Sequence, residues 1–377
     1  MTEKPPTKSE WKKLYALAKR VKDAAPWRYI FEDQVFCFID PSSQQPCLVS
    51  VMGVLGEHIS VAVYVGELSI QAVLSVFQQG ETEKTPDVLF STTQIQLSFE
   101  DRGDIEKRDY KIIKELGLKF RGKKEWPIFR SVWPSHAPYF VNREEAILLT
   151  CALEQLLEVL PQFEHSPDEI PFYSTGQLLF RVPSNSKWIS EVRPIPEAPD
   201  QTYKLEIDSE LVEEVQTLPR VSNILEIDSF INLAGIYGSR SERGVIPHML
   251  LVVEGESGMI LGFEILDPSD GMVEMWSEIP QVVLEILADN QIIPETVWVQ
   301  SPLVHKLLTP IFDQLGIEIK MVFELPKLEE ARISMLMSMS GGLPPGLIDA
   351  MQQMLEEFGG DFPDDMPPDF FDLFDED

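Results

Sequence analysis

Residues 48–64, LVSVMGVLGEHISVAVY, and residues 250–265, LLVVEGESGMILGFEI, decide the fold of this chain. Each stretch contains an apolar run, a G-x-x-G turn and a second apolar run, which is the pattern of a β-hairpin. The glycines suit these turns because glycine takes the positive φ angles that hairpin turns require. Neither turn has the G-x-G-x-x-G or G-x-x-x-x-G-K context of a phosphate-binding loop, so we interpret them as turns and not as ligand sites.

The elements around the two hairpins also match, which predicts two similar units on one chain. Apolar residues at helical or strand spacing, separated by glycine, proline and polar breaks, give each unit the order βββαβαβα. This alternation favours an α/β fold with mixed sheets, although an α+β arrangement is also open. In the first unit we expect strands or extended segments at 35–39, 48–64, 93–99 and 126–140, and helices at 9–24, 68–78, 105–116 and 143–161. In the second unit we expect strands at 223–233, 249–265, 296–300 and 317–324, and helices at 278–289, 302–315 and 327–338.

The same patterns divide the chain into four parts. We predict an N-terminal domain over residues 1–163, a Pro-rich connector with short strands over 164–219 and a C-terminal domain over 220–338. Residues 339–377 begin with a Gly/Pro hinge, continue into a short helix and end in a tail that alternates acids with Phe, Leu and Met. Such a tail has too little apolar surface to fold alone, so we expect it to be disordered.

Composition limits the class of protein. The 377 residues are 44% hydrophobic and carry a formal net charge of −31, which disfavours nucleic acid and anionic membranes as partners. The three cysteines have no C-x-x-C spacing, so neither a disulfide framework nor a zinc site is predicted. A polar N-terminus and the lack of a long apolar run predict no secretory signal and no membrane span. We therefore expect a cytoplasmic protein.

One catalytic hypothesis follows from the element order. Three strands followed by alternating helices and strands resemble the ribonuclease H-like fold of integrases and transposases. That resemblance implies an acid on the first strand, an acid after the fourth strand and an acid on a later helix, which together hold two metal ions. The matching positions in the first unit are Asp40, Asp101 and either Glu144 or Glu145.

The second unit breaks this acid pattern and is expected to be inactive. Its matching positions are Asp228, then Gln300 or Ser301 where an acid is required, then Glu329 or Glu330. The acids of the first unit also have an ordinary explanation, because carboxylates commonly sit in turns and at the beginnings of helices. Enzyme activity is therefore left open, a non-catalytic protein is preferred, and no metal or cofactor is predicted.

A basic segment follows Asp101. Residues 102–130 hold ten Lys and Arg residues against five acids, with aromatic residues between them. Such a segment can follow a nucleic-acid backbone, can receive the chain's own acidic tail, or can be an ordinary solvated surface. The candidate binding residues are Arg121, Lys123, Lys124, Trp126 and Arg130 of this segment, and Phe370, Phe371 and Phe374 of the tail.

The first unit also resembles an uncharacterised bacterial family. The resemblance rests on a set of short motifs: Trp11-x-x-Leu14-Tyr15, Pro26-Trp27, Val35-Phe36, Asp40-Pro41, Val51-Met52-Gly53-x-x-Gly56-Glu57, Tyr64-x-Gly66, Gly117-Leu118-Lys119-Phe120-Arg121-Gly122, Trp126-Pro127-x-Phe129-Arg130 and Glu144-Glu145-Ala146. In that family a second domain of unknown function commonly follows, and residues 219–338 look like it. The resemblance implies a cytoplasmic bacterial protein without an assigned activity, and it supplies no catalytic residue.

The sequence therefore predicts a non-catalytic binding protein whose acidic aromatic tail contacts an unidentified protein partner. The alternative is a metal-dependent, nuclease-like enzyme with a degenerate site. The oligomeric state is left open.

Overall fold

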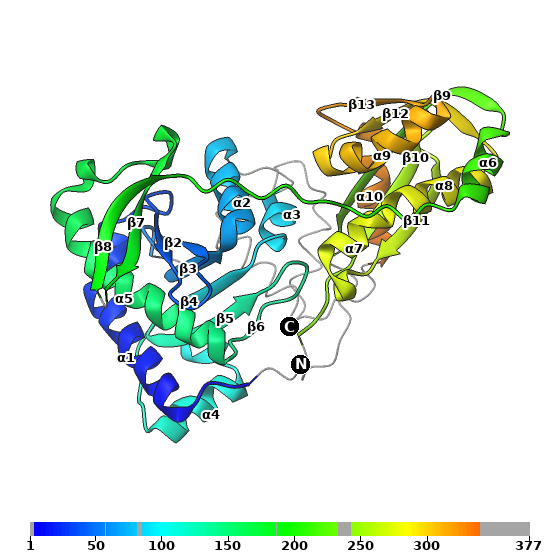
Figure 1. The fold of residues 1–377 in the computed structure, drawn as a ribbon. Coiled ribbons are helices and arrows are strands. Elements are labelled where there is room, and N and C mark those ends of the chain that lie inside the picture. Colours follow the sequence, from blue (N-terminus) through cyan, green and yellow to red (C-terminus); the bar gives the residue numbers. More distant parts are fainter. Residues whose placement is uncertain (1–3, 57, 81–84, 186, 233–242, 340–377) are drawn as a thin grey trace.

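The computed structural model shows residues 4–56, 58–80, 85–185, 187–232 and 243–339 folded around two mixed β-sheets (Figure 1). Helices cover both faces of each sheet, which confirms the predicted α/β class and the two units. The short helix and the tail predicted after residue 339 lie outside the described residues.

The first sheet has eight strands in the order β6-β5-β4-β3-β2-β1-β7-β8. Strands β1 to β6 pair antiparallel in succession, and β7 then returns parallel to β1. The hairpin β7–β8 lies within the predicted connector, so the strands expected there extend the first sheet. The bounds are β1 Phe36–Ile39, β2 Pro46–Met52, β3 Ser60–Val65, β4 Gln94–Glu100, β5 Trp126–Val132, β6 Tyr139–Phe140, β7 Gln177–Ser184 and β8 Lys187–Pro194.

Both faces of the first sheet are buried, which explains why its central strands read as nearly continuous apolar runs. In β2, Val49 and Val51 belong to the core beneath α1 and α5, whereas Leu48 and Met52 belong to the core beneath α2. The helices of this unit are α1 Lys8–Ala24, α2 Gly66–Gln79, α3 Thr85–Phe90, α4 Lys107–Leu116 and α5 Arg143–His165.

The second sheet has five strands in the order β11-β10-β9-β12-β13. Strands β9, β10 and β11 form an antiparallel meander, and β12 and β13 run parallel to β9. Helices α8 and α9 pack on one face and α10 packs on the other. The bounds are β9 Arg220–Ile231, β10 His248–Glu254, β11 Ile260–Leu266, β12 Ile293–Val299, β13 Glu318–Met321, α6 Ser209–Gln216, α7 Met272–Ser277, α8 Ile279–Asp289, α9 Pro302–Leu315 and α10 Pro326–Met339.

Glycines shape the two hairpin turns in different ways. Gly53 has a φ of 128°, and a Cβ there would lie 3.0 Å from the carbonyl oxygen of His58. Gly255 does not have a positive φ, but a Cβ there would lie 3.1 Å from the carbonyl oxygen of Ile224 on β9. The expected positive φ therefore holds at Gly53, at Gly56 (80°) and at Gly258 (74°), whereas Gly255 is required by close backbone approach.

Helix α5 is long and apolar enough to cross a membrane by length and composition, but it is a core helix here. Within its most apolar window, 56% of the residues are buried inside the fold. Leu149, Leu153 and Leu156 are fully buried against the first sheet. Its apolar surface is thus explained by packing.

The two units meet where the loop between β5 and β6 contacts the segment that leads into β10. His136 and Val245 form an isolated antiparallel bridge. The Ala137 amide donates to the Gly244 carbonyl at 2.8 Å, and the Ile246 amide donates to the Ser135 carbonyl at 2.8 Å. These backbone hydrogen bonds fix one side of the first unit against the start of β10.

Candidate functional site

Asp40, the first acid of the nuclease-like hypothesis, organises a turn. Its carboxylate accepts hydrogen bonds from the backbone amides and the hydroxyls of Ser42 and Ser43, at 2.6 to 3.2 Å. Burial alone would raise the pKa of Asp40, but these hydrogen bonds outweigh burial and hold the pKa below its usual value. The carboxylate therefore has a complete local role in the turn between β1 and β2.

The other acids of the first unit also have local partners or face solvent. Asp101 Oδ1 accepts from the Lys124 amide at 2.6 Å and so holds the loop before β5. Glu145 accepts at its two carboxylate oxygens from Ser131 Oγ at 2.6 Å and from the Asn142 amide at 2.8 Å, and thereby caps α5. Glu144 is exposed.

The acids of the second unit show the same kind of local pairing. Asp228 Oδ2 accepts from the Ser301 amide at 3.1 Å, at the end of β12. Glu329 pairs with Arg332 and Glu330 pairs with Lys327, each within one turn of α10. The nuclease-like hypothesis needs a second acid beside Asp228, and the structure places Ser301 there instead. Gln300, the other option, donates to the Phe323 carbonyl.

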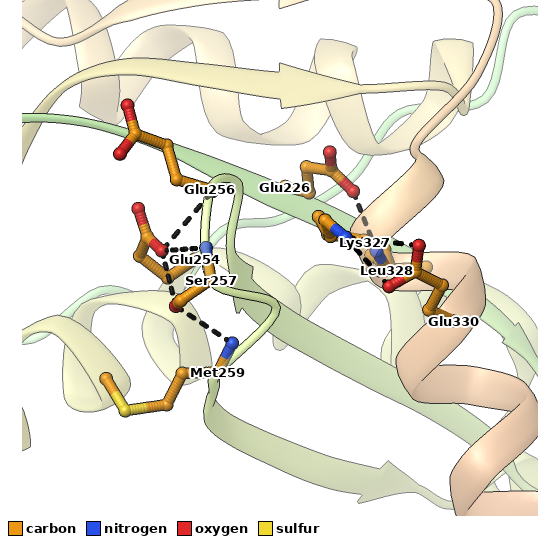
Figure 2. Close-up of polar contacts among 8 residues, drawn as sticks. All are labelled: Glu226, Glu254, Glu256, Ser257, Met259, Lys327, Leu328 and Glu330. Carbon is orange, nitrogen blue, oxygen red and sulfur yellow. Dashed lines mark hydrogen bonds and ion pairs between the residues drawn. The ribbon is translucent and has the colours of Figure 1, made fainter.

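The G-x-x-G turn of the second unit is closed by its own side chains (Figure 2). Glu254 Oε2 accepts from the Ser257 amide at 2.6 Å, from Ser257 Oγ at 2.5 Å and from the Glu256 amide at 3.2 Å. The amides that would cradle a phosphate are therefore already occupied. These hydrogen bonds, led by the one from the Ser257 hydroxyl, lower the pKa of Glu254.

Glu226 lies close to this turn and holds the start of α10 (Figure 2). Its Oε2 accepts from the Leu328 amide at 2.7 Å, whereas its Oε1 is buried without a hydrogen-bond partner among the described residues. Burial raises the pKa of Glu226. The carboxylate supplies the negative charge that a helix N-terminus favours, so it leaves no open anion site there. Within the described ranges, no three His, Cys, Asp or Glu residues are placed to hold a metal ion.

The basic segment separates into a buried part and an exposed part. Trp126 is 8% exposed and belongs to the core under α1 and α5. The side chain of Arg130 is 14% exposed, and its Nη2 lies 2.8 Å from both Asp109 Oδ2 and Glu106 Oε1. Lys124 is half-buried and pairs with Glu100 at 3.3 Å. These three candidate binding residues therefore stabilise the fold.

Arg121 and Lys123 are exposed, as a binding role requires, and the structure adds neighbours that the sequence prediction missed. Lys107, Lys111 and Lys114 are exposed on α4 at i, i+4 and i+7, the spacing that places side chains on one helix face. This lysine spacing is visible in the sequence, and it was the signal that could have predicted a basic face on α4. We call the following exposed residues the basic surface: Lys107, Arg108, Lys111, Lys114, Lys119, Arg121 and Lys123.

The basic surface holds few compensating charges, and the exposed acids Asp104 and Glu106 directly precede it in the chain. Between residues 107 and 124 the acids are Asp109, which is buried with Arg130, and Glu115, which is exposed. Helix α1 lies beside it, because Tyr15 stacks on Phe120 with ring centroids 6.0 Å apart. Residues 1–30 and 102–130 together contain 18 of the 31 Lys and Arg residues but only 8 of the 62 acids. The positive charge of an otherwise acidic chain is therefore concentrated on one part of the first unit.

A buried polar cluster lies at the contact between the two units. Ser135 Oγ lies 2.7 Å from His248 Nε2, and the His248 ring meets Trp276 edge to face at 4.6 Å. Arg243 Nη2 lies 3.6 Å from Glu145 Oε1. Burial lowers the pKa of His248 to about 4. A serine–histidine pair can act as a nucleophile only where substrate reaches the hydroxyl, and Ser135 is fully buried, so we interpret this cluster as a structural contact.

The fold and its surfaces define a two-sheet α/β chain with a concentrated basic surface. Residues 11–181 match the family model described as Domain of unknown function (DUF7309), and residues 211–336 match the one described as Domain of unknown function (DUF6930). The chain is thus similar to two domain families in tandem, in the order that the sequence resemblance led us to expect. Neither description assigns an activity, and no curated protein matches the chain.

Phe370, Phe371 and Phe374, the candidate binding residues of the tail, lie outside the described residues.

Proposed function

We propose that this chain is a non-catalytic, cytoplasmic interaction protein whose basic surface binds an acidic segment of a protein partner. The observation that carries the proposal is the set of seven exposed cations between residues 107 and 123, with Glu115 as the one exposed acid among them. A chain with a net charge of −31 has a strong excess of acids elsewhere, so this concentration sets the surface apart as a site for negative charge.

An acidic protein segment fits this surface better than nucleic acid does. Proteins that bind single strands combine cations with exposed aromatic rings on which bases stack. Here Trp126 and Phe129 are buried in the core, at 8% and 1% exposure, and the exposed ring of Tyr110 already has the Arg102 guanidinium 4.3 Å from its centre. What remains is a cationic surface for carboxylates.

The enzyme alternative has less support. Asp40, Asp101 and Glu145 each accept hydrogen bonds that a turn, a loop or a helix start needs. No observation in the described part of the chain brings these acids together around a substrate.

The test measures binding of a fluorescein-labelled 20-residue oligoglutamate by anisotropy. The triple variant Lys107→Glu, Lys111→Glu, Lys114→Glu is compared with Lys187→Glu, Lys204→Glu, Lys320→Glu, which makes the same charge change at exposed lysines elsewhere. We expect the first triple to weaken binding about tenfold or more and the second to change it little, since each exposed ion pair contributes about 0.2–1 kcal/mol.

Raising the salt from 0.1 M to 1 M shortens the Debye length from about 10 Å to about 3 Å, so binding should also weaken with salt. Equal loss in both triple variants would contradict a local site. Tighter binding of a 20-nucleotide oligothymidylate than of oligoglutamate would favour nucleic acid instead.

A further inference from the structure

We propose that the basic surface is occupied by the chain's own C-terminal segment, residues 359–377, which an acidic partner must displace. This inference rests on the proposed function of the same surface and adds its regulation. The sequence of the segment is GGDFPDDMPPDFFDLFDED, with eight acids, four phenylalanines and no basic residue.

Charge is the first reason for choosing this occupant. The segment carries eight carboxylates, and the basic surface carries seven cations with Glu115 as the exposed acid among them. Outside this surface and the neighbouring residues 1–30 the chain carries a large excess of acids, so the surfaces of the second unit attract the segment less. The basic surface is the place where this segment lowers the electrostatic energy most.

Aromatic and guanidinium groups on this surface are the second reason. Tyr110 on α4 is 41% exposed, and the Arg102 guanidinium lies 4.3 Å from the centre of its ring. Arg108 lies 4.1 Å from the ring centre of Phe140 in the same region. Phenylalanine rings from the segment can pack on Tyr110 and on exposed guanidinium groups such as Arg121 while the neighbouring aspartates meet lysines.

The length of chain between α10 and the segment permits this contact. Helix α10 ends at Met339, and residues 340–358 provide 19 residues of linker. With residues 340–346 extended and the expected short helix over 347–358 intact, such a linker spans about 40 Å, whereas a folded chain of this size has a radius of gyration of about 20 Å. A covalent tether of this length keeps the segment at an effective concentration of about 1 mM, so a contact with a Kd below that value is occupied in cis.

The first experiment maps the contact in the full-length chain with a carbodiimide, which joins a carboxylate directly to a lysine amine. We expect cross-links from residues 359–377 to lysines of the basic surface: Lys107, Lys111, Lys114, Lys119 and Lys123. The intact monomer is separated from any dimer before mapping. Cross-links confined to dimers would replace the cis contact by one between two copies, and the absence of these cross-links would overturn the inference.

The second experiment asks whether the segment competes with an acidic ligand, using the labelled oligoglutamate as probe. A neutral-tail variant changes all acids of the segment: Asp361, Asp364, Asp365, Asp369, Asp372, Asp375 and Asp377→Asn, with Glu376→Gln. Its control changes the three acids of the linker: Asp349→Asn, Glu356→Gln and Glu357→Gln. We expect the neutral-tail variant to bind oligoglutamate about tenfold more tightly than the unchanged chain, and the control to bind much as the unchanged chain does.

The outcomes separate the two proposals. If the neutral-tail variant and the unchanged chain bind oligoglutamate equally well, the segment does not occupy the surface, whereas the proposed function stands. If even the neutral-tail variant fails to bind oligoglutamate, the proposed function fails. The neutral-tail variant is also combined with Lys107→Glu, Lys111→Glu and Lys114→Glu. If this combination no longer binds oligoglutamate, both proposals are supported, because the site exposed by the neutral tail is then the basic surface.

Discussion

Ser135 Oγ lies 2.7 Å from His248 Nε2, a hydrogen bond between side chains 113 positions apart that joins the two units. Both residues are buried, and His248 Nδ1 has no hydrogen-bond partner among the described residues. A protonated imidazole would need partners at both nitrogens, so this contact favours neutral histidine.

His248 should make stability fall as the solution becomes acidic. Burial lowers its pKa from 6.5 to about 4 in the folded chain. Above pH 6.5 both folded and unfolded chains hold neutral histidine, and the full stability is present. Between pH 6.5 and pH 4 the unfolded chain takes up the proton first, which removes up to about 3 kcal/mol at the acidic end.

The check compares the unchanged chain with His248→Gln by thermal unfolding from pH 7.5 to 4.5. The variant lacks this proton uptake, so the Tm difference between the two proteins should shrink as the pH falls. Parallel Tm curves over the whole range would show that His248 does not titrate as its burial implies.

Glu226 and Glu254 should give opposite pH dependences although they lie close together (Figure 2). Burial raises the pKa of Glu226, so its contribution to stability is present at low pH and is lost as the pH rises through the folded pKa. Hydrogen bonds from Ser257 lower the pKa of Glu254, so its contribution is present above the unfolded pKa and is lost as the pH falls.

Two variants measured by chemical denaturation from pH 3.5 to 7.5 test this pair. Glu226→Gln should gain stability relative to the unchanged chain as the pH rises. Glu254→Gln should lose stability relative to it as the pH rises, because the hydrogen bonds to a full carboxylate are gone. Slopes of the same sign for both variants would contradict the structural explanation.

Arg130 should behave as a fold-stabilising residue and Lys123 as a surface residue. Asp109→Ala leaves the buried Arg130 guanidinium with Glu106 alone, and loss of one partner of a buried pair costs about 3–5 kcal/mol. Lys123→Ala removes an exposed cation, so unfolding should change by about 0.5 kcal/mol or less. Urea denaturation measures both changes, and similar midpoints for the two variants would restore Arg130 as a candidate binding residue.

The element order was predictable because it depends on neighbours along the chain. Gly117 and Gly316 directly follow the predicted helices at 105–116 and 302–315, and both take left-handed φ angles, of 71° and 66°, directly after α4 and α9. Apolar spacing and stop signals of this kind act over one or two turns, so the sequence alone shows them.

The candidate site was only partly predictable because exposure depends on contacts between distant segments. Arg130 and Lys123 look alike in the sequence, and only the packing of α4 against β5 brings Asp109 to Arg130. The contact between Ser135 and His248 likewise depends on how the two units meet. By contrast, the lysine spacing on α4 was present in the sequence and needed only the observation that this face is exposed.

Gly53 should tolerate no side chain, whereas another glycine of the same unit should. Gly53→Ala places a Cβ 3.0 Å from the His58 carbonyl oxygen at a φ of 128°, so we expect a loss of about 1–3 kcal/mol. Gly103→Ala meets nothing within 4 Å and has no positive φ, so stability should stay within about 0.5 kcal/mol. Urea denaturation of both variants measures the difference, and equal stability would mean that the first hairpin turn relaxes around the added methyl group.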